Sequence, residues 1–179
     1  HKDYNLKETI TGGKTFDNVT TNFLGYTPRT SANYFPTERA VPTISNGKYN
    51  FTCIMDYFPD GTIVHISNER TTHVGGKGIL IMRLSHDQGQ SWTDSTVIFN
   101  DPIYDSRNAG GGVTPSGRLI VFFTRYDTTT STFHDQGYIF SDDKGSTWSN
   151  YTTVSTGGHP IFSPYGKMTA GANGVLMQS

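Results

Sequence analysis

The chain has 179 residues and a formal net charge of −1, and no basic stripe runs through it, which argues against nucleic acid as a partner. Hydrophobic residues make up 34% of the chain, but no apolar run approaches the roughly 20 residues that span a bilayer, so membrane insertion is not expected. The 20 glycines and the abundant Ser and Thr favour short strands joined by tight turns over helices.

Residues 1–33 are polar, have no clear hydrophobic period and contain turn sequences such as Gly12-Gly13-Lys14. We expect them to form a lead-in or linker, and residues 34–179 to form the folded domain. The first unit of that domain covers residues 34–100. Its apolar or alternating segments predict strands at 39–44, 51–58, 62–68, 78–84 and 95–99.

A second unit, residues 101–157, follows the same plan. Its strands are predicted at 108–114, 118–124, 136–140 and 151–155. Residues 158–179 are expected to begin a third unit, because the turn Asn173-Gly174 follows Ser116-Gly117 at nearly the same interval that separates the first two units.

Two octapeptide turns make the repeat explicit. The pattern Ser-x-Asp-x-Gly-x-Ser/Thr-Trp occurs at 85–92 and at 141–148, and its tryptophans lie 56 residues apart (148 − 92). In such a turn the Asp accepts backbone N–H bonds, the Gly takes a positive φ and the Trp packs on the sheet. The residues expected to build these turns are Ser85, Asp87, Gly89, Trp92, Ser141, Asp143, Gly145 and Trp148.

The octapeptides resemble the Asp box, or BNR repeat, of the sialidase superfamily, where each copy joins the third and fourth strands of a propeller blade. The resemblance implies an all-β, sialidase-like β-propeller with four-stranded antiparallel blades. About two and a half to three blades would be present, at 34–100, 101–157 and, in part, 158–179. Because propellers typically have at least about four blades, we expect a fragment of a five- or six-bladed propeller.

The same resemblance implies a binding site at the propeller centre, where sialidases clamp a substrate carboxylate with three arginines. Arg39, in Arg39-Ala40-Val41-Pro42, is similar to the first of them, and a guanidinium can meet a carboxylate through two hydrogen bonds. Other charged or aromatic residues occupy strand ends that would converge on one face, although structural ion pairs are an equal alternative. The expected substrate-binding residues are Arg39, Arg70, Arg107, Arg125 and Tyr126.

The acid/base aspartate of the family has no counterpart here, because residues 71–78 contain neither Asp nor Glu. His73 could substitute for it, since an imidazole titrates near neutral pH, and Glu69 is the second catalytic candidate. The phage endosialidase branch also lacks this aspartate and resembles the chain more closely.

Two main functions therefore stay open. The first is a non-catalytic glycan- or receptor-binding module of an extracellular or phage tail protein, in which Tyr34, Tyr104 and Tyr126 could stack on sugars. The alternative is a sialidase-like glycoside hydrolase that acts on sialylated or other acidic glycans, with its remaining catalytic residues further along the protein. A structural propeller that binds a protein is the third possibility.

The expected partner is a cell-surface glycan, and the expected location is outside the cell or on a virion surface. A homo-oligomer is possible, and it would be a trimer if the protein belongs to a phage tail. No cofactor is expected, and no metal either, because the six histidines show no paired ligand spacing.

Overall fold

A computed structural model describes residues 47–73, 76–170 and 175–177, which are all-β and contain no helix. The predicted lead-in 1–33, the strand at 39–44, and the site candidates Tyr34 and Arg39 lie outside the described residues. No helix in these described ranges is long and apolar enough to cross a membrane.

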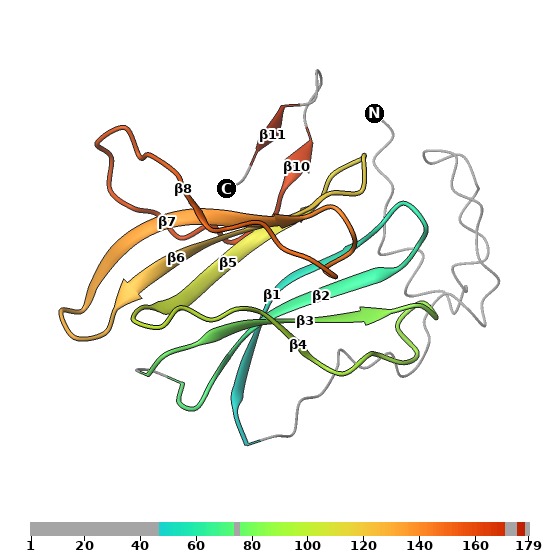
Figure 1. The fold of residues 1–179 in the computed structure, drawn as a ribbon, viewed down its shortest axis with the longest axis horizontal. Helices are drawn as coiled ribbons and strands as arrows, with labels where there is room; N and C mark the ends of the chain where they lie inside the picture. Colours follow the sequence, from blue (N-terminus) through green and yellow to red (C-terminus); the bar gives the residue numbers. More distant parts are fainter. Residues whose placement is uncertain (1–46, 74–75, 171–174, 178–179) are drawn as a thin grey trace, which may run out of the picture. The chain divides into compact units, whose positions relative to one another are not determined.

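The first sheet contains four antiparallel strands in the order β1-β2-β3-β4 (Figure 1). The bounds are β1 (Tyr49–Tyr57), β2 (Ile63–Arg70), β3 (Ile79–Ser85) and β4 (Thr96–Phe99). The order follows the chain, so each connection is a hairpin and the sheet is a simple meander, as the repeat predicts for one blade.

The second sheet repeats this meander and gains one strand. Its antiparallel strands are β5 (Asp105–Val113), β6 (Leu119–Asp127), β7 (Thr132–Ser141) and β8 (Thr152–Thr153). β9 (Gly166–Lys167) pairs parallel to the free edge of β5. A separate hairpin of β10 (Thr169–Ala170) and β11 (Leu176–Met177) follows.

Several strands are longer than predicted at one end. β5 begins at Asp105 instead of residue 108, and β7 begins at Thr132 instead of residue 136. Their added residues are mostly polar, so apolar periodicity does not reveal them. β8 is shorter than the predicted strand at 151–155. β9 lies in the segment expected to begin the third unit, and its parallel pairing with β5 was not predicted.

The core lies between the two sheets, where β1 packs against β5. Alternating apolar residues of the inner strands supply it, because successive side chains of a strand point to opposite faces. Its buried members include Ile54, Val64, Ile66, Leu80, Ala109, Leu119, Val121 and Phe123. Polar bonds also join the sheets, since the buried Asp56 accepts the backbone N–H of Val113 at 2.9 Å and pairs with Lys167 at 2.8 Å.

The octapeptide turns join β3 to β4 and β7 to β8. In the first, Asp87 accepts the N–H of Ser91 and the hydroxyl of Ser85, both at 2.8 Å. Gly89 has a φ of 87° and donates its N–H to the Ser85 oxygen at 2.7 Å. The hydroxyl and N–H bonds from Ser91 hold the pKa of Asp87 at about 2, so the carboxylate stays charged and the turn stays formed.

The second octapeptide turn has the same bonds. Asp143 accepts from Thr147 and Ser141, and Gly145 has a φ of 88°. The indole N–H of Trp148 donates to the Gly145 carbonyl at 3.1 Å. The bonds accepted by Asp87 and Asp143 are the ones expected from the residue types, and they close both turns at the same end of the strands.

His65, in the middle of β2, makes stability depend on pH. It is almost fully buried between Thr52, whose hydroxyl lies 3.1 Å from Nε2, and Trp92. Burial, and then the charge of Arg83, lowers the pKa of His65 from 6.5 to about 4. The unfolded chain therefore binds more protons between these values, so stability falls as the pH drops from about 6.5 to about 4.

We expect this fall in the free energy of unfolding to be about 3 kcal/mol. Urea unfolding across that pH window measures it, and His65→Gln should remove most of the slope. The matched control is His86→Gln, because His86 is exposed. An equal slope in wild type and His65→Gln would contradict this assignment.

Candidate functional site

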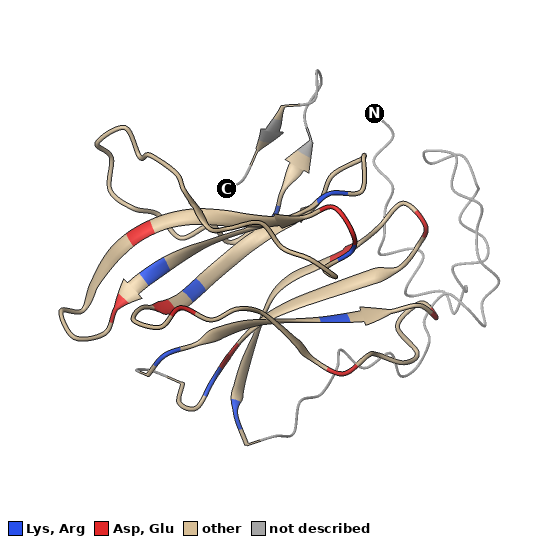
Figure 2. Ribbon diagram, viewed as in Figure 1, with Lys and Arg blue, Asp and Glu red and all other residues tan. Residues whose placement is uncertain are grey.

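The candidate site residues gather at the strand ends opposite the octapeptide turns. At this end β2 finishes, β5 begins, β6 finishes and β7 begins. Figure 2 shows charged residues of both signs there along β5, β6 and β7. We call the following group the strand-end cluster: Arg70, Asp101, Tyr104, Asp105, Arg107, Arg125, Tyr126, His134 and Asp135.

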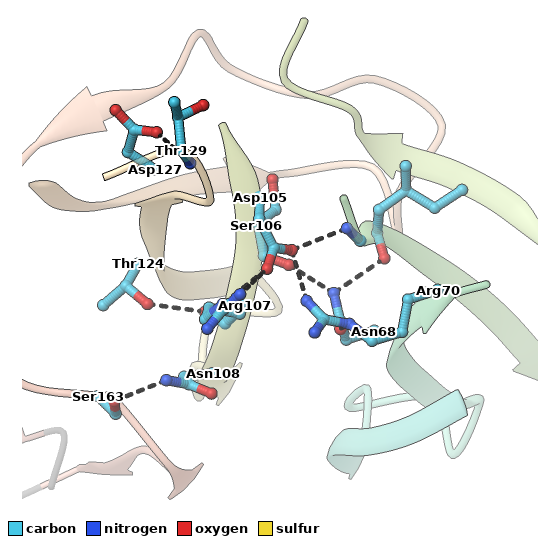
Figure 3. Close-up of polar contacts among 12 residues, drawn as sticks. Asn68, Arg70, Asp105, Ser106, Arg107, Asn108, Thr124, Asp127, Thr129 and Ser163 are labelled. Carbon is cyan, nitrogen blue, oxygen red and sulfur yellow. Dashed lines mark hydrogen bonds and ion pairs between the residues drawn. The ribbon is translucent and has the colours of Figure 1, made fainter. Parts of the chain in front are cut away.

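Asp105 is the centre of this cluster and is fully buried. Its Oδ1 accepts from Arg70 Nη2 at 2.5 Å and from the Gly78 N–H at 2.7 Å. Its Oδ2 accepts from Arg107 Nε at 2.7 Å and from Arg107 Nη2 (Figure 3). Four donors surround one carboxylate, which compensates for the free energy of removing its charge from water.

Asn68 holds Arg70 in place and ties the two sheets together. Its Oδ1 accepts from Arg70 Nε at 2.9 Å. Its Nδ2 donates to the carbonyls of Ser106, at 2.5 Å, and Ile79, at 3.2 Å (Figure 3). The guanidinium of Arg70 is therefore oriented by groups from both sheets before any ligand arrives.

Arg125 forms a second charged group with Asp101 and Asp135. Its Nε donates to Asp135 Oδ1 at 2.8 Å, its Nη2 also donates to Asp135, and its Nη1 donates to Asp101 at 3.0 Å. The hydrogen bonds that Arg125 donates to Asp135 raise the pKa of Arg125 despite its partial burial. Burial alone would raise the pKa of Asp135, but the bonds from Arg125 and from the Tyr151 hydroxyl hold it below its usual value.

Aromatic rings lie against these guanidinium groups. The Arg107 guanidinium carbon lies 3.7 Å from the Tyr126 ring centre, and Phe133 contacts Tyr126 edge-on. The rings of Tyr104 and His134 stack with centres 3.9 Å apart and planes inclined by 15°. Cation–π and stacking contacts of this kind fix the ring orientations.

The structure brings three predicted arginines together and assigns each an internal carboxylate. Arg70 and Arg107 share Asp105, and Arg125 has its own pair of acids. Tyr126 lies beside them. These contacts correspond to the ion-pair alternative stated for them above.

The two catalytic candidates, His73 and Glu69, contact residues outside the strand-end cluster. His73 is exposed and its ring packs against Tyr49 and Phe51, with centres 5.7 and 5.6 Å away. Glu69 is buried and pairs with Lys48 at 2.5 Å. Their roles stay predictions.

Sequence reasoning missed the acids Asp101, Asp105 and Asp135, together with His134. A sequence feature for Asp105 was present, because it stands 56 residues after Tyr49 at the start of the equivalent strand (105 − 49). Asp101 was also marked by the turn sequence Asp101-Pro102. Asp135 and His134 precede the predicted strand at 136–140 and had no such feature.

An apolar cavity lies near the site, between β6, β7 and the segment that follows β8. It has a volume of about 60 Å³ and is lined by Phe122, Phe123, Gln136, Gly137, Val154, Phe162 and Pro164. Ligand pockets usually measure about 300–1,000 Å³, so this cavity is too small for a sugar.

Four-stranded meanders whose first strands lie side by side are the architecture of a β-propeller. No family model and no curated protein matches the sequence. The structure is similar to that of a protein of unknown function from Dyadobacter fermentans DSM 18053. Their TM-score is 0.59, with 17% identity over 73% of this chain and 46% of that one.

The structure is also similar to the Hadza microbial sialidase Hz136, with a TM-score of 0.53 and 20% identity over 74% of this chain and 29% of that one. The chain spans less than half the length of either neighbour. Identities this low establish the fold alone, which is an all-β, sialidase-like β-propeller fold.

Proposed function

We propose that this chain is the glycan-recognising part of a sialidase-like propeller and that it binds without cleaving. The observation that carries the proposal is the strand-end cluster, where exposed and half-buried aromatic rings lie beside arginines at the strand ends opposite the octapeptide turns. Aromatic rings with a few fixed polar groups are the usual composition of sugar-binding surfaces. The sialidase-like fold adds an analogy, which by itself does not decide function.

The proposed lack of catalysis is supported by the contacts of the charged groups. Asp105 is buried and both of its oxygens already accept hydrogen bonds from within the protein, so it is poorly placed to exchange a proton with a substrate. The segment 71–78 supplies no carboxylate to take over that role. Glycoside hydrolysis ordinarily needs a carboxyl acid and a carboxyl base, and the other two acids of the cluster, Asp101 and Asp135, are both bound to Arg125.

The second candidate is a sialidase-like glycoside hydrolase for acidic glycans. It is favoured by Glu69 and Arg70 at the end of β2, and His73 would then serve as acid or base. The two candidates differ in turnover, because only the hydrolase releases sugar from a fluorogenic glycoside.

A receptor-binding role would place the protein outside the cell or on a virion surface, as in a phage tail. There a homotrimer would strengthen binding, because several weak sites act together on one cell surface. Location and oligomeric state are part of the proposal.

We expect the purified chain to bind members of a broad glycan array and to release no sugar from fluorogenic glycosides. Tyr126→Ala should weaken binding about tenfold, because it removes both an aromatic surface and the ring on which Arg107 lies. Tyr57→Ala is the matched control, since this exposed tyrosine ends β1 next to the hairpin turn. Turnover would support the hydrolase. If the chain neither binds nor cleaves a glycan, the protein-binding scaffold is the candidate that remains.

A further inference from the structure

The charges of the strand-end cluster balance within the protein. Three guanidinium groups meet three carboxylates: among the described residues, Arg107 pairs with Asp105, and Arg125 pairs with Asp101 and Asp135. Arg70 is likewise bound to Asp105 and to the Asn68 amide. A guanidinium that already holds a carboxylate in a bidentate pair has little left to attract a second one.

The other charged groups at this end, in the ranges that the structure describes, do not upset the balance. Lys48 pairs with Glu69. Lys77 donates to the Asp101 carbonyl at 2.6 Å. Its positive charge is matched in number by the negative charge of Asp127, whose carboxylate accepts backbone N–H bonds in the β6–β7 turn. The surface therefore offers a ligand no strong excess of positive charge.

A β-bulge presents an aromatic platform beside these ion pairs. In the register of β7 against β6, Asp135 lies opposite Arg125 and Phe133 lies opposite Tyr126. His134 has no opposite residue and is therefore an extra residue in β7. Bulges redirect side chains and are common near binding sites. Here the bulge lets Asp135 meet Arg125 while the neighbouring His134 stacks on Tyr104.

This platform is open to solvent. The His134 side chain is 42% exposed, and Ile103, next to Tyr104, is 69% exposed. Phe133 is 40% exposed. Tyr104 is fixed from behind, because Asp101 accepts its N–H at 2.7 Å and Arg125 lies 5.3 Å from its ring centre. In this rigid pair the His134 ring is exposed and the Tyr104 ring is half-buried, which suits stacking because little motional freedom is lost when a ligand binds.

We infer that the Tyr104–His134 pair is the sugar-stacking platform and that its ligand is an uncharged glycan, not a sialylated one. This inference rests on the proposed function. The C–H groups of one pyranose face would lie on the exposed ring of His134, and the ring hydroxyls would point to the polar groups around it. A sialic acid carboxylate would instead approach acids whose arginines are already engaged, and it would lose hydration without gaining a counter-ion.

The test is a glycan array made of matched pairs that differ only in a terminal sialic acid, probed with wild type, His134→Ala and His86→Ala. We expect the neutral member of a pair to bind at least as well as the sialylated one. His134→Ala should weaken binding about tenfold, as expected for the loss of one stacked ring. His86→Ala replaces an exposed histidine at the opposite strand end and should bind as wild type. Affinity for the neutral glycans should also change little with salt, since no ion pair forms.

Each other outcome has a definite meaning. Binding restricted to the sialylated members overturns this inference and leaves the proposed function standing. Neutral binding that is unchanged in His134→Ala overturns the platform. Binding to no member of the array overturns the proposed function, and this inference falls with it. Circular dichroism of each variant ensures that a lost signal reflects the site and not the fold.

Discussion

Replacing Asp105 by asparagine is expected to lower the free energy of unfolding by about 3–5 kcal/mol, the range found when one partner of a buried ion pair is removed. Asparagine has nearly the same shape, but it carries no charge and has one acceptor oxygen instead of two. Arg70, which is buried, and the partly buried Arg107 would then repel each other without a counter-ion. Urea unfolding followed by far-UV circular dichroism measures the change.

The matched control is Asp142→Asn. Asp142 also accepts two hydrogen bonds from one arginine, at 2.7 and 2.8 Å from Arg118, but both side chains are exposed. Water screens that pair, so its loss should change stability little. Equal effects of the two substitutions would mean that Asp105 is not a buried structural anion, and they would reopen it as a residue free to bind or to react.

Gly111→Ala, in the middle of β5, is expected to destabilise the fold by roughly 4 kcal/mol, through overpacking and backbone strain together. Gly111 has a φ of 142°, and a Cβ there would overlap the carbonyl oxygen of Ile120 on β6. Neither strand can move away easily, because the Gly111 carbonyl also accepts the N–H of Met168 at 2.6 Å. The methyl group would force apart the strand pairs on both sides of β5.

Gly61→Ala is the control for this prediction. Gly61 also has a positive φ, of 86°, but its Cβ position faces open space in the turn between β1 and β2. Only backbone strain is then added, at about 1 kcal/mol. If both alanine variants unfold at similar urea concentrations, crowding at β5 is not what requires glycine there.

The repeated architecture could be predicted from the sequence because the turns are held by contacts between residues that are close in the chain. Asp87 and Asp143 bond to residues within four positions of themselves, and Gly89 and Gly145 supply the positive φ that these turns need. Such contacts depend on residue types and short spacings. Apolar alternation located the middles of β2, β3 and β6 for the same reason, because the period of a strand is local.

The strand ends could not be predicted as well, because they are polar. Asp105 and Arg107 lie within β5, although the predicted strand began at residue 108. Their place in the sheet comes from pairing with β6 and from contact with Arg70, and neither appears in the apolar pattern. The extra residue His134 is likewise a consequence of how β7 is matched to β6.

The sequence was thus sufficient for the fold class, the blade repeat and the end of the strands at which charged residues gather, since each depends on neighbours in the chain. It was not sufficient to predict which partners those charged side chains bind. Arg70 meets Asp105 across 35 residues, and Arg125 meets Asp101 across 24. An arginine at a strand end has the same sequence signature whether its partner is a ligand or an internal acid. Only the packing of one sheet on the next brings these acids within hydrogen-bond distance, and that packing gives Arg70, Arg107 and Arg125 internal carboxylate partners.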